Sequence, residues 1–310
     1  MSLMLLDAAS LYFRAFYGVK ASIPAPDGTP TNAVRGFLDM VSTLITRYHP
    51  TDLVACLDQD WRPAWRVALL PTYKTHRLAD QQTAPGGGGA PPGEAEPEGL
   101  AEQVPIILEV LDALGIAAVG VDEHEADDVI ATFAERATTP VDVVTGDRDL
   151  FQLIDDDRDV RVLYTARGVT KIQVMDAAAL RARYGIEPSQ YADFATLRGD
   201  PSDGLPGVPG IGEKTAASLL ARFGSLDALL EAAAGRDPRL AGVAGKLTAA
   251  RDYLMVAPRV VGTVRTLTLP ATDTTLPNHP PDAGRLTELA ERWGIDNVLG
   301  RSVKALGSAG

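Results

Sequence analysis

The acidic residues between Asp122 and Asp128 are the part of this sequence whose types and spacing best suit chemistry. Five of these seven positions are Asp or Glu, and the apolar residues Val129, Ile130 and Phe133 follow them directly. This pattern predicts a helix whose first turns carry carboxylates. Acids near a helix N-terminus also stabilise the helix, by about 0.3–1 kcal/mol each, so this run alone does not establish a site.

Further acids stand at the ends of apolar, strand-like runs elsewhere in the chain. Asp7, Asp58 and Asp147 each follow such a run, and the carboxyl ends of parallel strands in an α/β sheet open onto one crevice. Asp149 lies two residues after Asp147, and Asp200 and Asp203 flank the entry to a glycine-rich segment. The candidate acids are Asp7, Asp58, Glu125, Asp127, Asp128, Asp147, Asp149, Asp200 and Asp203.

The chemistry of such a set follows from its donor atoms. Oxygen ligands without His or Cys favour a hard cation, Mg²⁺ or Mn²⁺, over zinc. Two such ions activate a water and stabilise the leaving oxygen of a phosphodiester. Without cations, mutual repulsion would raise the pKa values of the acids. We therefore predict a site for two or more Mg²⁺ or Mn²⁺ ions.

The composition is that of an ordinary globular protein, with 45% hydrophobic and 23% charged residues in 310. The net charge of −12 argues against a nucleic-acid partner, but the nine acids carry −9 of it and leave about −3 for the rest. No apolar stretch reaches the roughly 18 residues of a membrane span, and residues 1–7 read as a first strand rather than a signal peptide. The single cysteine, Cys56, fits a reducing, cytoplasmic compartment.

The order of the elements predicts the architecture. Strand-like runs alternate with helical ones over residues 1–175, which predicts a mainly parallel twisted sheet with helices on both faces. Residues 176–310 are expected to be helical. Between 84 and 99, ten of sixteen residues are Gly or Pro, so we expect a flexible loop there rather than a domain linker.

A second motif lies between Gly199 and Gly224. Its sequence Leu-Pro-Gly-Val-Pro-Gly-Ile-Gly-Glu-Lys-Thr-Ala (205–216) predicts a glycine-punctuated hairpin that opens a helix. Glycines let backbone N–H groups approach an anion at a helix N-terminus, and Lys214 adds a positive charge. This element, within residues 199–233, is expected to contact phosphates.

In combination these motifs resemble the 5′-nuclease family, which comprises stand-alone bacterial flap endonucleases and the N-terminal 5′→3′ exonuclease domain of DNA polymerase I. The matching stretches are Leu-Leu-Asp7, Cys-Leu-Asp58, Tyr73-Lys74-x-x-Arg77, Glu125-Ala-Asp-Asp128, Gly-Asp147-Arg-Asp149, Gly-Asp200-Pro-Ser-Asp203 and the glycine hairpin. No polymerase segment follows, so the stand-alone type is expected, and the composition looks actinobacterial.

The resemblance implies a PIN-like nuclease fold and specific roles for residues. It implies that the nine acids line a divalent-metal site, that Lys74 and Arg77 contact the scissile phosphate at the base of a helical arch (about residues 70–100), and that Tyr73 stacks on a base. The hairpin corresponds to a helix–turn–helix element that often binds K⁺. The expected catalytic residues are Lys74, Arg77, Asp128 and Asp147, and the expected DNA contacts are Arg66, Tyr73, Lys74, Arg77, Gly210, Gly212, Lys214 and Thr215.

The expected activity is flap endonuclease and 5′→3′ exonuclease cleavage of DNA with 5′ flaps, nicks or 5′ ends, by a monomer. Two departures stand out: Gly204 replaces the family's usual Asn beside Asp203, and the Gly/Pro-rich segment occupies the place of the arch. One alternative is a protein that binds branched DNA without cutting it, although the acids would repel DNA unless metals neutralise them. A second alternative is a haloacid-dehalogenase-type phosphatase, because Asp58-Gln-Asp60 after a strand resembles the nucleophile motif of those enzymes. Trp61 argues against this alternative.

Overall fold

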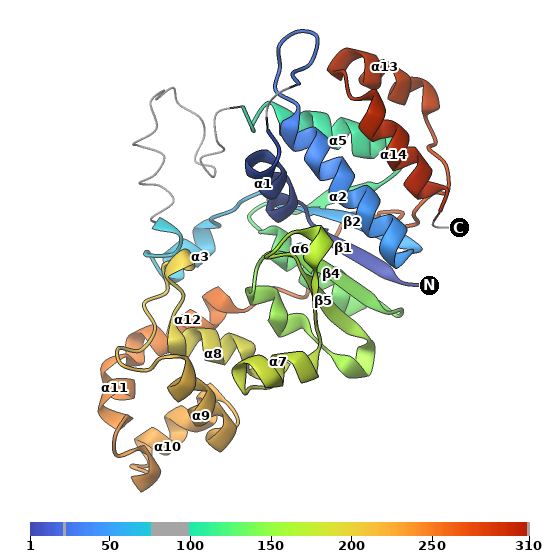
Figure 1. The fold of residues 1–310 in the computed structure, drawn as a ribbon. Coiled ribbons are helices and arrows are strands. Elements are labelled where there is room, and N and C mark those ends of the chain that lie inside the picture. The colour runs from blue at the N-terminus through green and yellow to red at the C-terminus, as the bar shows by residue number, and fades with distance from the viewer. Residues whose placement is uncertain (21–22, 76–98, 309–310) are drawn as a thin grey trace.

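The computed structural model describes residues 1–20, 23–75 and 99–308 (Figure 1). Its centre is a six-stranded sheet in the order β3-β2-β1-β4-β5-β6. All neighbouring strands are parallel except β5 and β6, which are antiparallel. The strands are β1 (Leu3–Asp7), β2 (Asp52–Leu57), β3 (Ala117–Gly120), β4 (Val141–Thr145), β5 (Val160–Tyr164) and β6 (Gln173–Met175).

Alternate residues of the strands build two separate cores, one on each face of the sheet. In β1, Leu3 and Leu5 belong to one buried cluster, whereas Met4 and Leu6 belong to the other, as the period of two in a strand requires. One face is covered by α1 (Ala8–Gly18), α2 (Asn32–Tyr48) and α5 (Gln103–Leu114), and the other by α6 (Ala126–Arg136) and α7 (Ala177–Tyr184). The predicted α/β sheet with helices on both faces is confirmed.

The strand order explains why the acids come together. The chain steps from β1 outward through β2 and β3, then returns to the other side of β1 with β4 and β5. The carboxyl ends of β1, β2 and β4 therefore lie side by side at the point where the order reverses, which is the usual place for a site in an open α/β sheet. Asp7 ends β1, Asp58 follows β2, and Asp147 lies just after β4.

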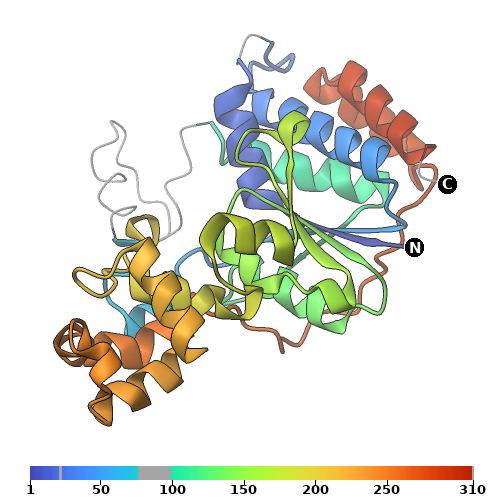
Figure 2. The ribbon, with the colours of Figure 1, turned by 60° about the horizontal axis from the view of Figure 1, so that its bottom comes forward.

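The helices of residues 191–261 form a second body beside the sheet (Figures 1 and 2). It contains the α9–α10 helix pair, and α8 and α12 pack against each other. Its elements are α8 (Tyr191–Arg198), α9 (Glu213–Phe223), α10 (Leu226–Ala234), α11 (Ala244–Ala249) and α12 (Arg251–Val261), while the short α3 (Ala64–Leu69) contacts α12.

Two expectations differ from the structure. The strand-like runs expected within residues 1–175 include Val169–Ile172, but Val169–Lys171 is a short 3₁₀ helix, and the strand that pairs with β5 begins at Gln173. The helical region 176–310 is also not one body, because α13 (Ala283–Trp293) and α14 (Asp296–Leu306) return to pack on α5 and α2 of the sheet region. Their apolar residues, among them Trp293 and Leu299, complete that core.

Candidate active site

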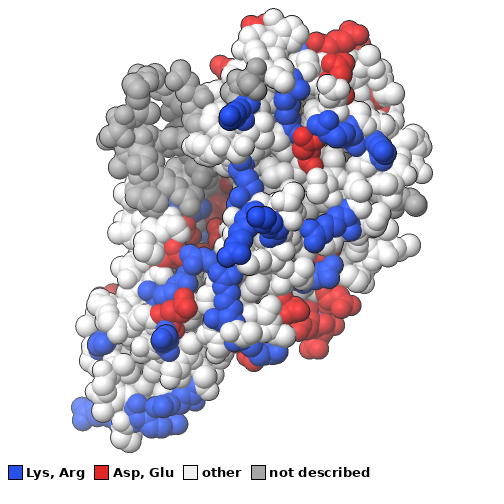
Figure 3. Space-filling model, in the orientation of Figure 1, with Lys and Arg blue, Asp and Glu red and all other residues white. Residues whose placement is uncertain are grey.

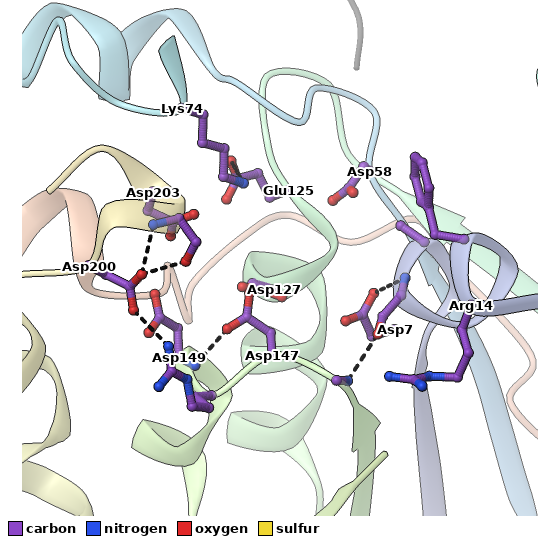
Figure 4. Close-up of a pocket in the computed structure, with 16 residues that line it drawn as sticks. Asp7, Arg14, Asp58, Lys74, Glu125, Asp127, Asp147, Asp149, Asp200 and Asp203 are labelled. Atoms are coloured by element: carbon purple, nitrogen blue, oxygen red, sulfur yellow. Dashed lines mark hydrogen bonds and ion pairs between the residues drawn. The ribbon is translucent and has the colours of Figure 1, made fainter. Parts of the chain in front are cut away.

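A pocket of about 370 Å³ opens at the carboxyl edge of the sheet (Figure 4). Acids approach it from β1, from the N-terminus of α6, from the turn after β4 and from the short 3₁₀ helix Pro201–Asp203. Eight of the nine predicted acids line it, together with two arginines and one lysine: Asp7, Asp58, Glu125, Asp127, Asp147, Asp149, Asp200, Asp203, Arg14, Arg148 and Lys74.

Asp7 is fixed at the centre of the sheet edge. Its carboxylate accepts hydrogen bonds from the Ser10 backbone N–H at 3.0 Å, as the N-cap of α1, and from the Thr145 hydroxyl at 2.6 Å. Burial, together with repulsion from Asp58 and Asp147, nevertheless raises the pKa of Asp7 from 3.8 to about 7. The two hydrogen bonds lower the pKa but do not offset the loss of solvent and the nearby negative charges.

Asp127 and Asp149 also have raised pKa values. Burial raises the pKa of each well above 3.8, and the charge of Asp147 raises both further. Asp147 itself is partly exposed, and its Oδ1 accepts a hydrogen bond from the Asp149 N–H at 2.9 Å. The nearby cations, Lys74 for Asp127 and Arg198 for Asp149, lower these pKa values but do not offset burial and the neighbouring acids.

Other acids of the pocket are held by protein donors. Asp58 Oδ1 accepts from the N–H of Ala126, at the start of α6, at 2.6 Å. Asp200 Oδ2 accepts from Arg198 at 3.0 Å and Arg148 at 3.3 Å, and its Oδ1 accepts from Ser202. Such contacts fix the direction of each carboxylate before any ligand arrives.

Glu125 contacts three side chains from the segment Arg66–Lys74. Lys74 Nζ donates to it at 2.9 Å, the Tyr73 hydroxyl donates at 2.9 and 3.0 Å, and Arg66 Nη1 lies 3.0 Å from Oε2. Lys74 itself lines the pocket, and its contact with the scissile phosphate stays a prediction. Tyr73 is only 3% exposed with its hydroxyl on Glu125, so the base-stacking role expected for it does not fit this position.

Asp128 and Arg66 also differ from expectation. Asp128 is completely buried and does not line the pocket; its two oxygens accept from Arg66 at 2.7 and 3.0 Å, and Oδ1 also accepts from the Val264 N–H at 2.8 Å. Arg66, expected to contact DNA, is only 2% exposed. A buried carboxylate needs a partner of opposite charge, and here each group satisfies the other. Their placement contradicts the metal and catalytic roles expected for Asp128 and the DNA contact expected for Arg66.

The glycine hairpin lies at the N-terminus of α9, as predicted. Gly212 is the N-cap of that helix, Lys214 is exposed and Thr215 is half-buried. Gly210 adopts φ +77°, and its carbonyl oxygen accepts a hydrogen bond from Lys246 Nζ at 3.0 Å. Lys246 belongs to α11 and was not identified from the sequence, because its distance along the chain hides its proximity.

Gly204, which replaces the family's usual Asn, has a steric role. It adopts φ +70°, and a Cβ atom there would lie 2.0 Å from the Thr72 carbonyl oxygen. The Lys74 N–H donates to the Asp203 carbonyl oxygen at 3.0 Å in the same contact. The absence of a side chain at position 204 therefore lets the segment before the expected arch approach Asp203 closely.

Some residues of the site were missed, and others lie outside the described ranges. Phe13 and Arg14 line the pocket from α1; the signal was their position about two turns after Asp7. Arg77 and residues 84–98 of the Gly/Pro-rich loop are not among the described residues. Within the described part of the chain, no three Asp, Glu, His or Cys side chains already surround one point as the ligands of one ion would. No helix there is long and apolar enough to cross a bilayer.

Comparison with known proteins decides the family. Residues 2–185 match the family described as 5'-3' exonuclease, N-terminal resolvase-like domain, and residues 186–284 match the one described as 5'-3' exonuclease, C-terminal SAM fold. The chain belongs to the 5′-3′ exonuclease family. A 5'-3' exonuclease of Streptomyces coelicolor is 56% identical over 304 residues, which cover 98% of this chain and 99% of that protein. One of Mycobacterium tuberculosis is 49% identical over 313 residues, covering 98% and 97%.

A solved structure shares this fold. The structure of the T5 5'-exonuclease with bound zinc aligns with a TM-score of 0.65 at 18% identity and covers all of both chains. The predicted family, the predicted α/β nuclease fold with a helical second region, and the class of enzyme are thereby confirmed.

Proposed function

We propose that this protein is a metal-dependent, structure-specific 5′ nuclease that hydrolyses DNA at 5′ flaps, nicks and 5′ ends. The observation that carries the proposal is the pocket in which Asp7, Asp127 and Asp149 have raised pKa values. A fold that gathers unneutralised carboxylates at its sheet edge loses stability, and a bound cation removes that loss. The oxygen-only donor set fits Mg²⁺ or Mn²⁺.

The residues of the pocket divide into two groups under this proposal. Asp7, Asp58, Asp127, Asp147 and Asp149 would hold the ions, with Asp203 beside them. Bound ions would activate a water and stabilise the leaving oxygen of the phosphodiester. The T5 protein is described with divalent metal ions bound, which agrees with the assignment.

The remaining groups place the DNA. Lys74 Nζ would stabilise negative charge on the phosphate in the pocket, where its contact with Glu125 already holds it. The exposed Lys214 and the backbone N–H groups at the start of α9 would bind duplex phosphates without reading bases. Figure 3 shows Lys and Arg side chains crossing the face that contains the recessed acids, so the net negative charge does not prevent DNA from approaching. K⁺ at the hairpin, a monomeric state and a cytoplasmic location remain predictions.

The decisive experiment uses a 5′-labelled flap and a nicked duplex with Mg²⁺, Mn²⁺ or EDTA. We expect cleavage with either ion, none in EDTA, and a 5′-phosphate on the downstream product. Asp147→Asn should abolish cleavage and retain DNA binding, because Asp147 holds ions rather than DNA. Asp112→Asn, an exposed acid of α5, is the matched control and should behave as wild type. Binding of branched DNA without cleavage under any ion would instead support the non-catalytic alternative.

A further inference from the structure

Arg66 is the most deeply buried Lys or Arg among residues 1–20, 23–75 and 99–308. Its guanidinium contacts residues from two segments, the start of α6 and the end of α12. It forms a two-pronged ion pair with Asp128, lies 3.0 Å from Glu125 Oε2, and donates from Nε to the Val260 carbonyl oxygen at 3.1 Å. A planar guanidinium with five N–H donors serves these acceptors at once, which an ammonium group cannot do.

Asp128, the partner of Arg66, is itself held in place by a second donor. It is a residue of the first turn of α6, and the Val264 N–H binds the same Oδ1 as Arg66 Nη2. The pair therefore joins α3, α6 and the segment after α12. Because Asp128 is completely buried, Arg66 supplies the countercharge that its ionised form requires.

The network continues from Arg66 to the pocket through Glu125. Arg66 approaches Oε2, while Lys74 donates to Oε1 and the Tyr73 hydroxyl bridges both oxygens. Lys74 Nζ has a second acceptor in the Trp61 carbonyl oxygen at 3.1 Å. The position of the Lys74 ammonium at the pocket thus depends on where Glu125 points, and Glu125 is directed by Arg66.

We infer that Arg66 is a positioning residue for the nuclease: paired with Asp128, it orients Glu125 and thereby holds Lys74 at the phosphate. The inference rests on the proposed function, which gives Lys74 its role at the phosphate. It replaces the expectation that Arg66 contacts DNA, which its burial contradicts. It also gives Asp128 a function that does not require a metal.

A double-mutant cycle tests this coupling. Single-turnover cleavage of a 5′ flap is measured for wild type, Arg66→Lys, Lys74→Ala and the double variant, with flap affinity measured in Ca²⁺. We expect Arg66→Lys to slow cleavage on the order of 10- to 100-fold, as loss of a supporting contact does, with little change in affinity. In the Lys74→Ala background the same substitution should have almost no further effect, since the residue through which it acts is gone.

Two controls separate positioning from folding. Arg301→Lys removes a guanidinium from an exposed pair with Asp39 at 2.7 Å and should leave the cleavage rate unchanged. Tyr73→Phe keeps the ring but removes a hydroxyl donor to Glu125. It should therefore slow cleavage when Lys74 is present and have almost no further effect in the Lys74→Ala background, as expected for Arg66→Lys. If Arg66→Lys fails to fold, the cycle with Tyr73→Phe decides.

The outcomes are distinct. Rate losses that multiply in the double variant would show that Arg66 acts independently of Lys74 and would overturn the inference, as would wild-type cleavage by Arg66→Lys. A loss of flap affinity without a change in rate would restore the DNA-contact role. Absence of cleavage by the wild type itself would refute the proposed function rather than the network.

Discussion

Replacing Asp7 by Asn should stabilise the metal-free protein at neutral and alkaline pH, although it should abolish cleavage. Asp7 is buried beside Asp58 and Asp147, and its pKa rises from 3.8 to about 7. At 1.36 kcal/mol per unit, this difference corresponds to about 4 kcal/mol. Asn retains an acceptor for the Ser10 N–H and serves as a helix cap about as well as Asp, so little is lost in exchange.

The sign of the pH dependence follows from the direction of the shift. The folded protein binds the Asp7 proton more tightly than the unfolded chain does, so the associated stability is complete below pH 4 and is lost as the pH rises through 7. The free energy of unfolding of Asp7→Asn should therefore equal that of wild type near pH 4 and exceed it by about 4 kcal/mol at pH 8, a rise of roughly 8 °C in Tm.

The assay is urea or thermal unfolding in EDTA between pH 4 and 8, repeated with Mg²⁺. Mg²⁺ should stabilise the wild type more than Asp7→Asn, because the ion neutralises the carboxylate that the variant lacks. Asp112→Asn is again the matched control. A difference in free energy of unfolding between wild type and Asp7→Asn that stays constant from pH 4 to pH 8 would refute the reasoning. The buried charge would then have no energetic consequence.

Three further changes probe the other parts of the site. Lys74→Ala should slow single-turnover flap cleavage by about 10²–10³-fold, far more than shortening Gly86–Gly89 does. Lys20→Ala, at the surface, is the control and should have no effect. A larger loss from the shortened loop would contradict this ranking. Lys214→Ala should weaken duplex binding equally for all sequences and reduce the salt slope by about 1, as measured by fluorescence anisotropy, and a sequence-selective loss would indicate base readout instead. Gly204→Asn should lower the free energy of unfolding by about 1–3 kcal/mol and slow cleavage, because the new side chain meets the Thr72 carbonyl oxygen, whereas Gly168→Asn, at a similar φ in open space, should leave cleavage intact.

Local sequence determined the elements and the edge at which the site forms. Leu3–Leu6 and Val141–Thr145 are apolar enough to predict buried parallel strands, and that topology alone places Asp7 and Asp147 at one edge. The acids after Val121 likewise predicted the start of α6, which begins at Ala126 with Glu125 as its N-cap. The glycines of the hairpin predicted the start of α9, because that turn needs a residue that adopts φ +77° at Gly210.

The tertiary structure decided what each acid does. Asp127 and Asp128 are adjacent in the sequence, but neighbours on a helix point about 100° apart, so one lines the pocket and the other faces the interior. The partner of Asp128 is Arg66, 62 positions earlier, and the countercharge of Glu125 includes Lys74. A carboxylate binds a metal or an arginine according to which cation packing brings within a few ångströms, because electrostatic interaction depends on distance in space and burial rather than on distance along the chain.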